Sequence, residues 1–118
     1  VTVNASPQLL YQYISTPAGL ASWYADDVRA NEEIYTFVWN GVEEAAQILR
    51  KKLDDHIRFH WEDDNDASTY FEIKINVNDM TQEVSLIITD FALPNEIEEA
   101  KQLWELQIND LKAKIGAS

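Results

Sequence analysis

The sequence has no cysteine and few glycines, prolines and basic residues. Without cysteine, the chain can form no disulfide bond, thiolate metal site or cysteine nucleophile. The glycines, at positions 19, 41 and 116, are too few and too scattered for a phosphate-binding loop or a serine nucleophile elbow. The lack of cysteine also fits a reducing compartment, and we expect a cytoplasmic protein.

Positive charge is scarce as well. Nine Lys and Arg residues stand against 21 Asp and Glu residues, which gives a net charge of −12. Such a surface repels phosphate backbones and anionic lipid headgroups, so we expect no nucleic-acid partner. No apolar run approaches the ~20 residues that a membrane-spanning helix requires, and no signal-peptide pattern is visible. Membrane insertion is therefore not expected.

The remaining composition is that of a globular protein. The chain has 118 residues, of which 46% are hydrophobic and 25% charged. This length suits one hydrophobic core, so we predict a single domain over residues 1–118. Thirteen aromatic residues, four of them tryptophan, must be accommodated in or near that core.

Two helix-start signals lie near the N-terminus. Ser6 precedes Pro7, and Thr16 precedes Pro17. A hydroxyl side chain caps the first helical turn, and proline is tolerated there because its missing N–H would have no helical partner. We predict two short consecutive helices, preceded by a short strand over residues 2–4.

The segment from residue 28 to residue 91 alternates apolar and polar residues with a period of two. This pattern predicts a meander of six antiparallel strands with one packed face. Asn40-Gly41 suits a tight hairpin turn, because both residues accept positive φ angles. Residues 43–53 would also suit a helix, but their place between two strands favours a strand.

A long amphipathic helix is predicted over residues 96–115. Asn95 is the expected N-cap, with Glu98 three residues later, and Gly116 is the expected C-cap residue. An apolar stripe with three- and four-residue steps is predicted to face the sheet. The stripe consists of Ile97, Ala100, Trp104, Ile108, Leu111 and Ile115.

This order of elements, together with several segments, resembles a known family. Residues 5–17 read ASPQLLYQYISTP, followed by Leu20 and Trp-Tyr-Ala at 23–25; the end of the chain has Trp104 and Asp-Leu-Lys at 110–112. These features resemble the START-like (SRPBCC) superfamily, near the branch named after the activator of a heat-shock chaperone ATPase. The nearest relatives expected are uncharacterised bacterial START-like domains. The resemblance implies the α+β helix-grip fold, in which a strongly twisted antiparallel sheet wraps around a long C-terminal helix.

The resemblance also implies a cavity between the sheet and the last helix that holds apolar molecules. Large aromatic side chains suit such ligands, yet they equally suit a filled core, and both interpretations stay open. The candidate ligand-binding residues are Trp23, Tyr24, Phe37, Trp39, Phe59, Trp61, Phe71, Trp104 and Ile108.

No catalytic residues, metal ligands or cofactor are predicted. His56 and His60 would share a metal on a helix, but on a strand they lie ~13 Å apart. The acidic run 62–66 lacks the glycine and final glutamate of a calcium loop, which favours an acidic hairpin turn.

The leading functional hypothesis is therefore non-catalytic binding of a small hydrophobic ligand. The first alternative is a protein-interaction module or chaperone co-factor that uses the acidic surface. A homodimer becomes credible if Leu103 and Leu106 form an exposed patch. The second alternative is an enzyme acting on aromatic or polyketide-like substrates, for which Asp90 and Tyr70 are residues of the required type.

Overall fold

Two short helices open the fold of residues 1–116, which the computed structural model describes. They are α1 (Pro7–Ser15) and α2 (Pro17–Ala21). The Ser6 hydroxyl oxygen accepts a hydrogen bond from the Leu9 N–H at 3.2 Å, and that of Thr16 accepts one from the Gly19 N–H at 2.9 Å. Both predicted N-caps are confirmed.

Gly19 allows these helices to pack closely. A Cβ atom at this position would lie 2.1 Å from the Gln12 carbonyl oxygen and 2.7 Å from the Cα of Tyr13. Only glycine fits there, because both neighbouring atoms belong to the backbone of α1.

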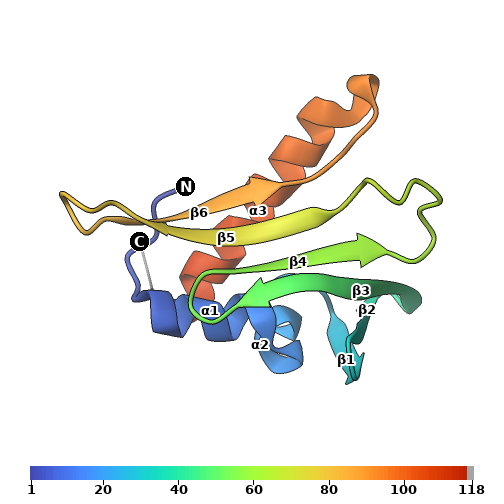
Figure 1. Cartoon of the computed structure of the whole chain (residues 1–118), viewed down its shortest axis with the longest axis horizontal. Helices are drawn as coiled ribbons and strands as arrows, with labels where there is room; N and C mark the ends of the chain where they lie inside the picture. The colour runs from blue at the N-terminus through green and yellow to red at the C-terminus, as the bar shows by residue number, and fades with distance from the viewer. Residues whose placement is uncertain (117–118) are drawn as a thin grey trace.

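Six strands follow the helices and form one antiparallel sheet in chain order (Figure 1). The strands are β1 (Asp27–Asn31), β2 (Ile34–Trp39), β3 (Val42–Lys52), β4 (His56–Trp61), β5 (Phe71–Val77) and β6 (Val84–Thr89). The six-strand meander is thus confirmed, and the ambiguous segment 43–53 lies in β3 as far as Lys52, with Leu53 in the following turn. Asn40 and Gly41 have φ angles of 50° and 79°, as the predicted hairpin turn requires.

The strand predicted over residues 2–4 is wrong as a full element. Thr2 forms a single antiparallel bridge with Ser85, and the Val3 N–H donates to the Val84 carbonyl oxygen at 2.9 Å. The Ala5 N–H then donates to the Val3 carbonyl oxygen at 3.0 Å, which turns the chain towards α1. The segment is too short for a longer ladder with β6.

The core lies between the sheet and the two short helices. Leu10, Ile14 and Leu20 come from the helices, and Phe37 and Phe59 come from the strands. All five side chains are fully buried in one hydrophobic cluster. The period-two alternation of the strands supplies this packed face.

The last helix, α3 (Ile97–Ile115), begins differently from the prediction. Asn95 does not cap it: the 3₁₀ helix η1 (Pro94–Glu96) precedes α3, and Glu96 takes the N-cap position without a side-chain hydrogen bond. Pro94 fixes its own φ, and the Glu96 N–H donates to the Leu93 carbonyl oxygen at 2.8 Å. The first turn therefore begins at Pro94, one residue before the predicted N-cap Asn95. Gly116 ends the helix at φ 72°, as predicted.

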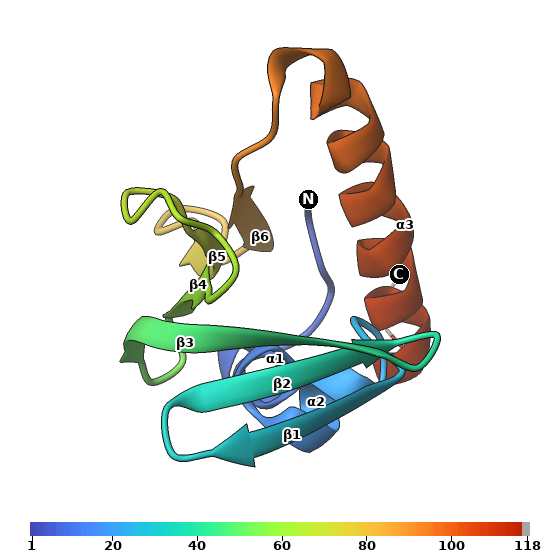
Figure 2. The ribbon, with the colours of Figure 1, turned by 90° about the vertical axis from the view of Figure 1, so that its right-hand side faces the viewer.

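The apolar stripe of α3 is buried at one end only. Ile108 and Leu111 are 2% and 0% exposed, whereas Ile97 is 41% exposed. Figure 2 shows the N-terminal half of α3 standing away from β6, with the first residues of the chain between them. The C-terminal half of the stripe is thus buried in the interior, as predicted for the whole stripe, whereas its N-terminal half lines a hollow.

Candidate ligand-binding site

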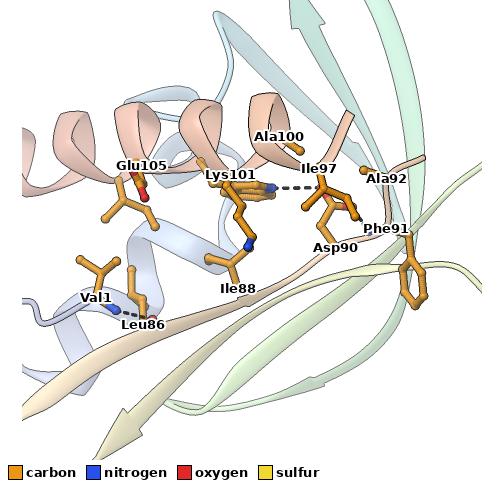
Figure 3. Close-up of a pocket in the computed structure, with 12 residues that line it drawn as sticks. Val1, Leu86, Ile88, Asp90, Phe91, Ala92, Ile97, Ala100, Lys101 and Glu105 are labelled. Atoms are coloured by element: carbon orange, nitrogen blue, oxygen red, sulfur yellow. Dashed lines mark hydrogen bonds between the residues drawn. The ribbon is translucent and has the colours of Figure 1, made fainter. Parts of the chain in front are cut away.

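A cavity of about 450 Å³ lies between β6 and the N-terminal half of α3 (Figure 3). We call it the apolar cavity. Its apolar lining residues are Val1, Leu86, Ile88, Phe91, Ala92, Ile97, Ala100, Trp104 and Ile108. Its charged lining residues, Asp90, Lys101 and Glu105, are exposed, so they border the solvent. The volume falls within the range of small-molecule sites.

The periods of the two elements create this lining. Leu86 and Ile88 are two residues apart on β6, so their side chains leave the strand on the same face. Ala100, Trp104 and Ile108 are four residues apart and lie on one face of α3. Since the side chain of Ala100 is a single methyl group, the helix leaves space opposite the strand.

A hydrogen bond connects the end of β6 to α3 beside the cavity. The Trp104 indole N–H donates to the Asp90 carboxylate at 3.0 Å, and the other carboxylate oxygen accepts from the Phe91 N–H at 2.8 Å. Asp90 is therefore a structural acceptor at the point where the chain leaves the sheet. The sequence indicates Asp90 only as a residue of the type that an enzyme would require, because its separation from Trp104 along the chain hides this structural role.

Four of the predicted site residues lie in the packed core. Phe59 stacks on Phe71 with ring centroids 5.0 Å apart, and Phe37 packs edge-on against Phe59 at 5.6 Å. All three rings are fully buried. Trp23 is also buried, and its indole N–H donates to the Tyr13 carbonyl oxygen at 2.9 Å. The three phenylalanines fill the interior beneath the candidate site, whereas Trp23 also borders a separate hollow together with Tyr24 and Trp39.

A second hollow of about 430 Å³ contains the other predicted aromatic residues. We call it the aromatic pocket. It is lined by Tyr24, Trp39, Glu44, Trp61, Asp90, Leu103, Trp104 and Gln107. Trp104 and Asp90 line both hollows, so the two are neighbours. Of the nine candidate residues, Ile108 lines the apolar cavity, Trp104 lines both hollows, and Tyr24, Trp39 and Trp61 line the aromatic pocket.

Tyr24 is the centre around which the aromatic pocket is built. Its carbonyl oxygen accepts from the Trp39 indole N–H at 2.9 Å and from the Gln107 amide at 3.1 Å. Burial raises the pKa of the Tyr24 phenol far above its ordinary value, and the negative charges of Asp90 and Glu44 raise it further. The phenol therefore stays neutral at all physiological pH values.

Several pocket residues were not among the predicted candidates. Glu44 lies on β3 and Gln107 on α3, and only the tertiary fold brings them together. Leu86 and Ile88 carry an ordinary strand pattern, and Ala100 an ordinary helix pattern. The apolar faces of β6 and α3, considered together, would have indicated these three residues, because the two segments follow each other along the chain and each has one apolar face to cover.

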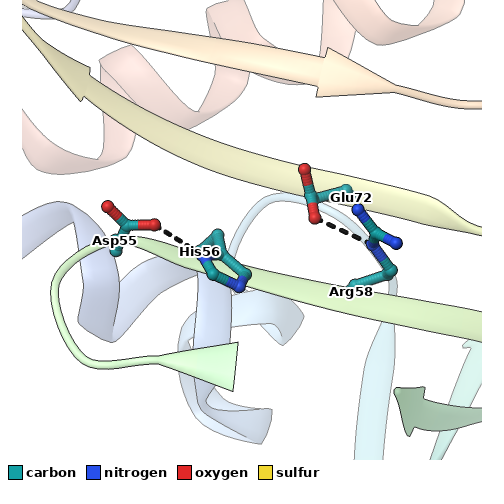
Figure 4. A network of polar contacts seen from close by, with 4 residues as sticks. All are labelled: Asp55, His56, Arg58 and Glu72. Carbon is teal, nitrogen blue, oxygen red and sulfur yellow. Dashed lines mark hydrogen bonds and ion pairs between the residues drawn. The ribbon is translucent and has the colours of Figure 1, made fainter. Parts of the chain in front are cut away.

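The two histidines each have a partner of their own. The His56 ring bonds to the Asp55 carboxylate, next to an ion pair between Arg58 and Glu72 at 2.9 Å (Figure 4). His60 Nδ1 lies 2.8 Å from the Thr69 carbonyl oxygen. The hydrogen bond from His56 lowers the pKa of Asp55 below its ordinary value. Both imidazoles thus act as structural groups of β4.

The acidic run after β4 is a hydrogen-bonded turn. Asp64 accepts from the Thr69 hydroxyl and from the Asp66 N–H, and Asp66 accepts from Ser68. These hydrogen bonds lower the pKa values of both aspartates. In residues 1–116, no three His, Asp or Glu side chains gather in a way that could hold a metal ion.

None of the helices described here has the length and apolarity needed to cross a bilayer.

Known proteins with the same architecture were found among solved structures only. No curated protein matches this sequence. Among solved structures, BfR322 from Bacteroides fragilis is 36% identical, with a TM-score of 0.66, over 97% of this chain and 86% of the other.

Two more distant structures share the fold. The Aha1 dimer from Colwellia psychrerythraea is 15% identical, with a TM-score of 0.76, over 95% of this chain and 89% of the other. The AHSA1 protein from Silicibacter pomeroyi is 17% identical, with a TM-score of 0.59, over 95% and 91% of the two chains. A family model described as the START-like superfamily domain matches residues 1–117. The chain therefore belongs to the START-like superfamily, as its opening and closing segments predicted.

Proposed function

We propose that the protein binds a small, largely apolar molecule in the apolar cavity and does not transform it. The observation that carries this proposal is the cavity between β6 and α3, whose lining combines nine apolar residues with three charged residues that are exposed. An apolar ligand would gain roughly 25 cal/mol for each Å² of apolar surface that it removes from water. The charged residues would orient a polar end towards solvent.

The positions of the candidate acid and base groups support binding over catalysis. Asp90 already accepts hydrogen bonds from Trp104 and Phe91. The Tyr70 ring packs on Phe91 at 5.2 Å and lies under the Arg58 guanidinium at 3.9 Å. A general acid or base must be free to reach the reacting centre. Here each is held by other contacts.

A displacement assay with a neutral apolar dye such as Nile red tests the proposal. Ala100→Trp places a large ring in the cavity, so dye binding should fall by at least about tenfold. Ala113→Trp is the matched control, since Ala113 is exposed on the same helix. Dye binding that is equal in both variants, or absent from the unaltered protein, would refute the proposal. Native mass spectrometry of protein purified from its own host would then give the mass of the natural ligand.

A second candidate function is self-association through the outer surface of α3. Leu103 and Leu106 are three residues apart, share one face of the helix, and are 57% and 64% exposed. The Colwellia psychrerythraea structure is described as a dimer, which favours a second copy of this chain as the occupant. This surface would also suit the alternative role of a protein-interaction module or chaperone co-factor.

Light scattering with Leu106→Glu tests self-association. A dimer built on this face should dissociate, because the substitution buries an unpaired charge at the interface. Leu93→Glu, which changes an equally exposed leucine outside α3, should leave the dimer intact. A monomeric unaltered protein at all accessible concentrations would exclude this candidate.

For the location of the protein, the absence of cysteine supports the cytoplasm.

A further inference from the structure

The aromatic pocket has a composition that the apolar cavity lacks. Three tryptophans, Trp39, Trp61 and Trp104, surround it together with Tyr24. Trp104 lies parallel to Tyr24 with centroids 5.3 Å apart, whereas Trp39 meets Tyr24 edge-on at 5.4 Å. Trp39 and Trp61 are 6.0 Å apart and tilted by 57°. The indoles therefore meet the hollow from different directions.

Hydrogen bonds fix two of these rings and use up their polar edges. The Trp39 N–H donates to the Tyr24 carbonyl oxygen, and the Trp104 N–H donates to the Asp90 carboxylate. The three tryptophans are only partly buried, so ring surface stays open to the hollow. Each indole already stacks one face on a neighbouring ring: Trp39 on Phe37, Trp61 on Phe71 and Trp104 on Tyr24. The opposite π face is therefore what each ring can offer to a ligand.

The charge of the pocket has a single sign. Glu44 and Asp90 line it, and within residues 1–116 no lysine, arginine or histidine does so. Glu44 makes no ion pair in this part of the chain, unlike its neighbour Glu43, which pairs with Arg29 at 2.6 Å. The net charge of −12 strengthens the negative potential around the hollow.

The buried Tyr24 side chain adds an independent observation. Its ring is almost fully buried and lines the hollow, but its hydroxyl oxygen keeps contact with solvent, because no side-chain oxygen or nitrogen of the described residues is both buried and without a hydrogen-bond partner. Glu44 and Asp90 line the same hollow as Tyr24, and their negative charges help to raise the pKa of its phenol. The phenol thus places a neutral, solvent-accessible oxygen beside two carboxylates.

We propose that the aromatic pocket binds a quaternary or N-methylated ammonium cation. Such a cation cannot donate enough hydrogen bonds to replace its hydration, so tryptophan faces and nearby carboxylates are the groups that stabilise it. A metal ion would need several oxygen or nitrogen ligands at short distance, which three indole faces do not provide. The proposal goes beyond ligand binding in the apolar cavity, because a small cation has no apolar body to fill that cavity.

Titration with choline, followed by tryptophan fluorescence and calorimetry, tests the proposal. We expect saturable binding that weakens as salt is added. The neutral isostere 3,3-dimethylbutanol has the same shape without the charge, and should bind at least about tenfold more weakly. Equal binding of the two compounds, or no saturation with choline, would overturn the proposal.

Matched variants locate the cation. Glu44→Gln should weaken choline binding severalfold, whereas Glu43→Gln on the adjacent position of β3 should not. Trp61→Phe should weaken it moderately and Trp61→Leu strongly, because the π face becomes smaller and is then lost. Circular dichroism would verify that each variant folds. Unchanged binding in Glu44→Gln and Trp61→Leu would place the cation elsewhere and refute the assignment.

The same assay can distinguish a free organic cation from a lipid headgroup as the ligand. Choline represents a free organic cation, and monomeric dihexanoylphosphatidylcholine represents a lipid headgroup. We expect choline to bind more tightly, because the lipid phosphate would meet the carboxylates of Glu44 and Asp90. Ala100→Trp should abolish dye binding in the apolar cavity but leave choline binding intact, so failure of either proposal can be told from failure of the other.

Discussion

The two halves of α3 have the same apolar periodicity but different surroundings. At the C-terminal end, Ile108 and Leu111 are buried against the rest of the fold. At the N-terminal end, Ile97 is partly exposed and Ala100 lines the apolar cavity. An amphipathic stripe therefore shows which face of a helix is apolar, but not what covers that face.

The difference has a physical origin in how the two ends are attached. In the C-terminal half, the Gln107 amide donates a hydrogen bond to the Tyr24 carbonyl oxygen. The Leu111 side chain belongs to the same hydrophobic core as Tyr24. The N-terminal half follows η1 and a connector, and the Trp104–Asp90 hydrogen bond ties it to the end of β6. We infer that stability is concentrated at one end of the helix and ligand access at the other.

The largest expected effect is at the buried end. Leu111→Ala should lower the free energy of unfolding by about 2–5 kcal/mol, because it leaves a cavity in the core. Urea denaturation followed by circular dichroism measures this loss. Leu106→Ala, on the exposed face of the same helix, should cost less than about 0.5 kcal/mol. Similar losses in both variants would show that the two faces of α3 are not differently packed.

A smaller effect is expected where the buried end terminates. Gly116→Ala should cost about 1 kcal/mol, because its φ of 72° is strained for a residue with a Cβ atom. No neighbouring atom lies within 4 Å of that Cβ, so the cost is conformational. Gly116→Asn should lose less stability than Gly116→Ala in urea denaturation, because asparagine tolerates this conformation better. A stabilising Gly116→Ala substitution would contradict the assigned helix end.

The attachment of the open end can be broken separately. Asp90→Ala removes the acceptor of the Trp104 indole N–H and should cost about 1 kcal/mol. Amides of residues 97–104 should exchange with solvent faster in this variant, while those of residues 108–115 should change little. Asp90→Asn keeps an acceptor oxygen and serves as the control. Equal acceleration along the whole helix would mean that α3 opens as one unit.

The smallest effect on stability is expected at the open end itself. Ile97→Ala should change the free energy of unfolding by less than about 1 kcal/mol, since the side chain is already partly exposed. Its binding of the neutral dye should nevertheless weaken, because Ile97 lines the apolar cavity. Loss of stability without loss of dye binding would reverse the assignment of the two halves.

Local chemistry explains which features were predictable. Ser6-Pro7, Thr16-Pro17 and Asn40-Gly41 act through their own and neighbouring backbone groups, so the elements that they start or connect were predicted correctly. Asn95 failed as an N-cap because the adjacent Pro94 formed a 3₁₀ turn first. The predicted strand at residues 2–4 failed because its length depends on how far β6 runs alongside it.

The candidate site was predictable only in part, since its residues come from distant segments. Trp39, Trp61 and Trp104 were identifiable as large aromatic residues of the expected fold. Phe37 and Phe71 share that character, and nothing in a strand pattern distinguishes a ring in the core from a ring beside a hollow. Glu44 and Asp90 resemble other surface carboxylates until the fold places them together.

By itself, the sequence determined the kinds and order of most elements, the apolar faces and the strongly negative charge. These depend on residue periodicity, on caps and turns, and on composition, all of which act over a few residues or over the whole chain. Only the tertiary structure decided that α3 is covered at one end and open at the other. That outcome depends on the curvature of the sheet and on contacts between β6, the connector and α3, which no local pattern encodes.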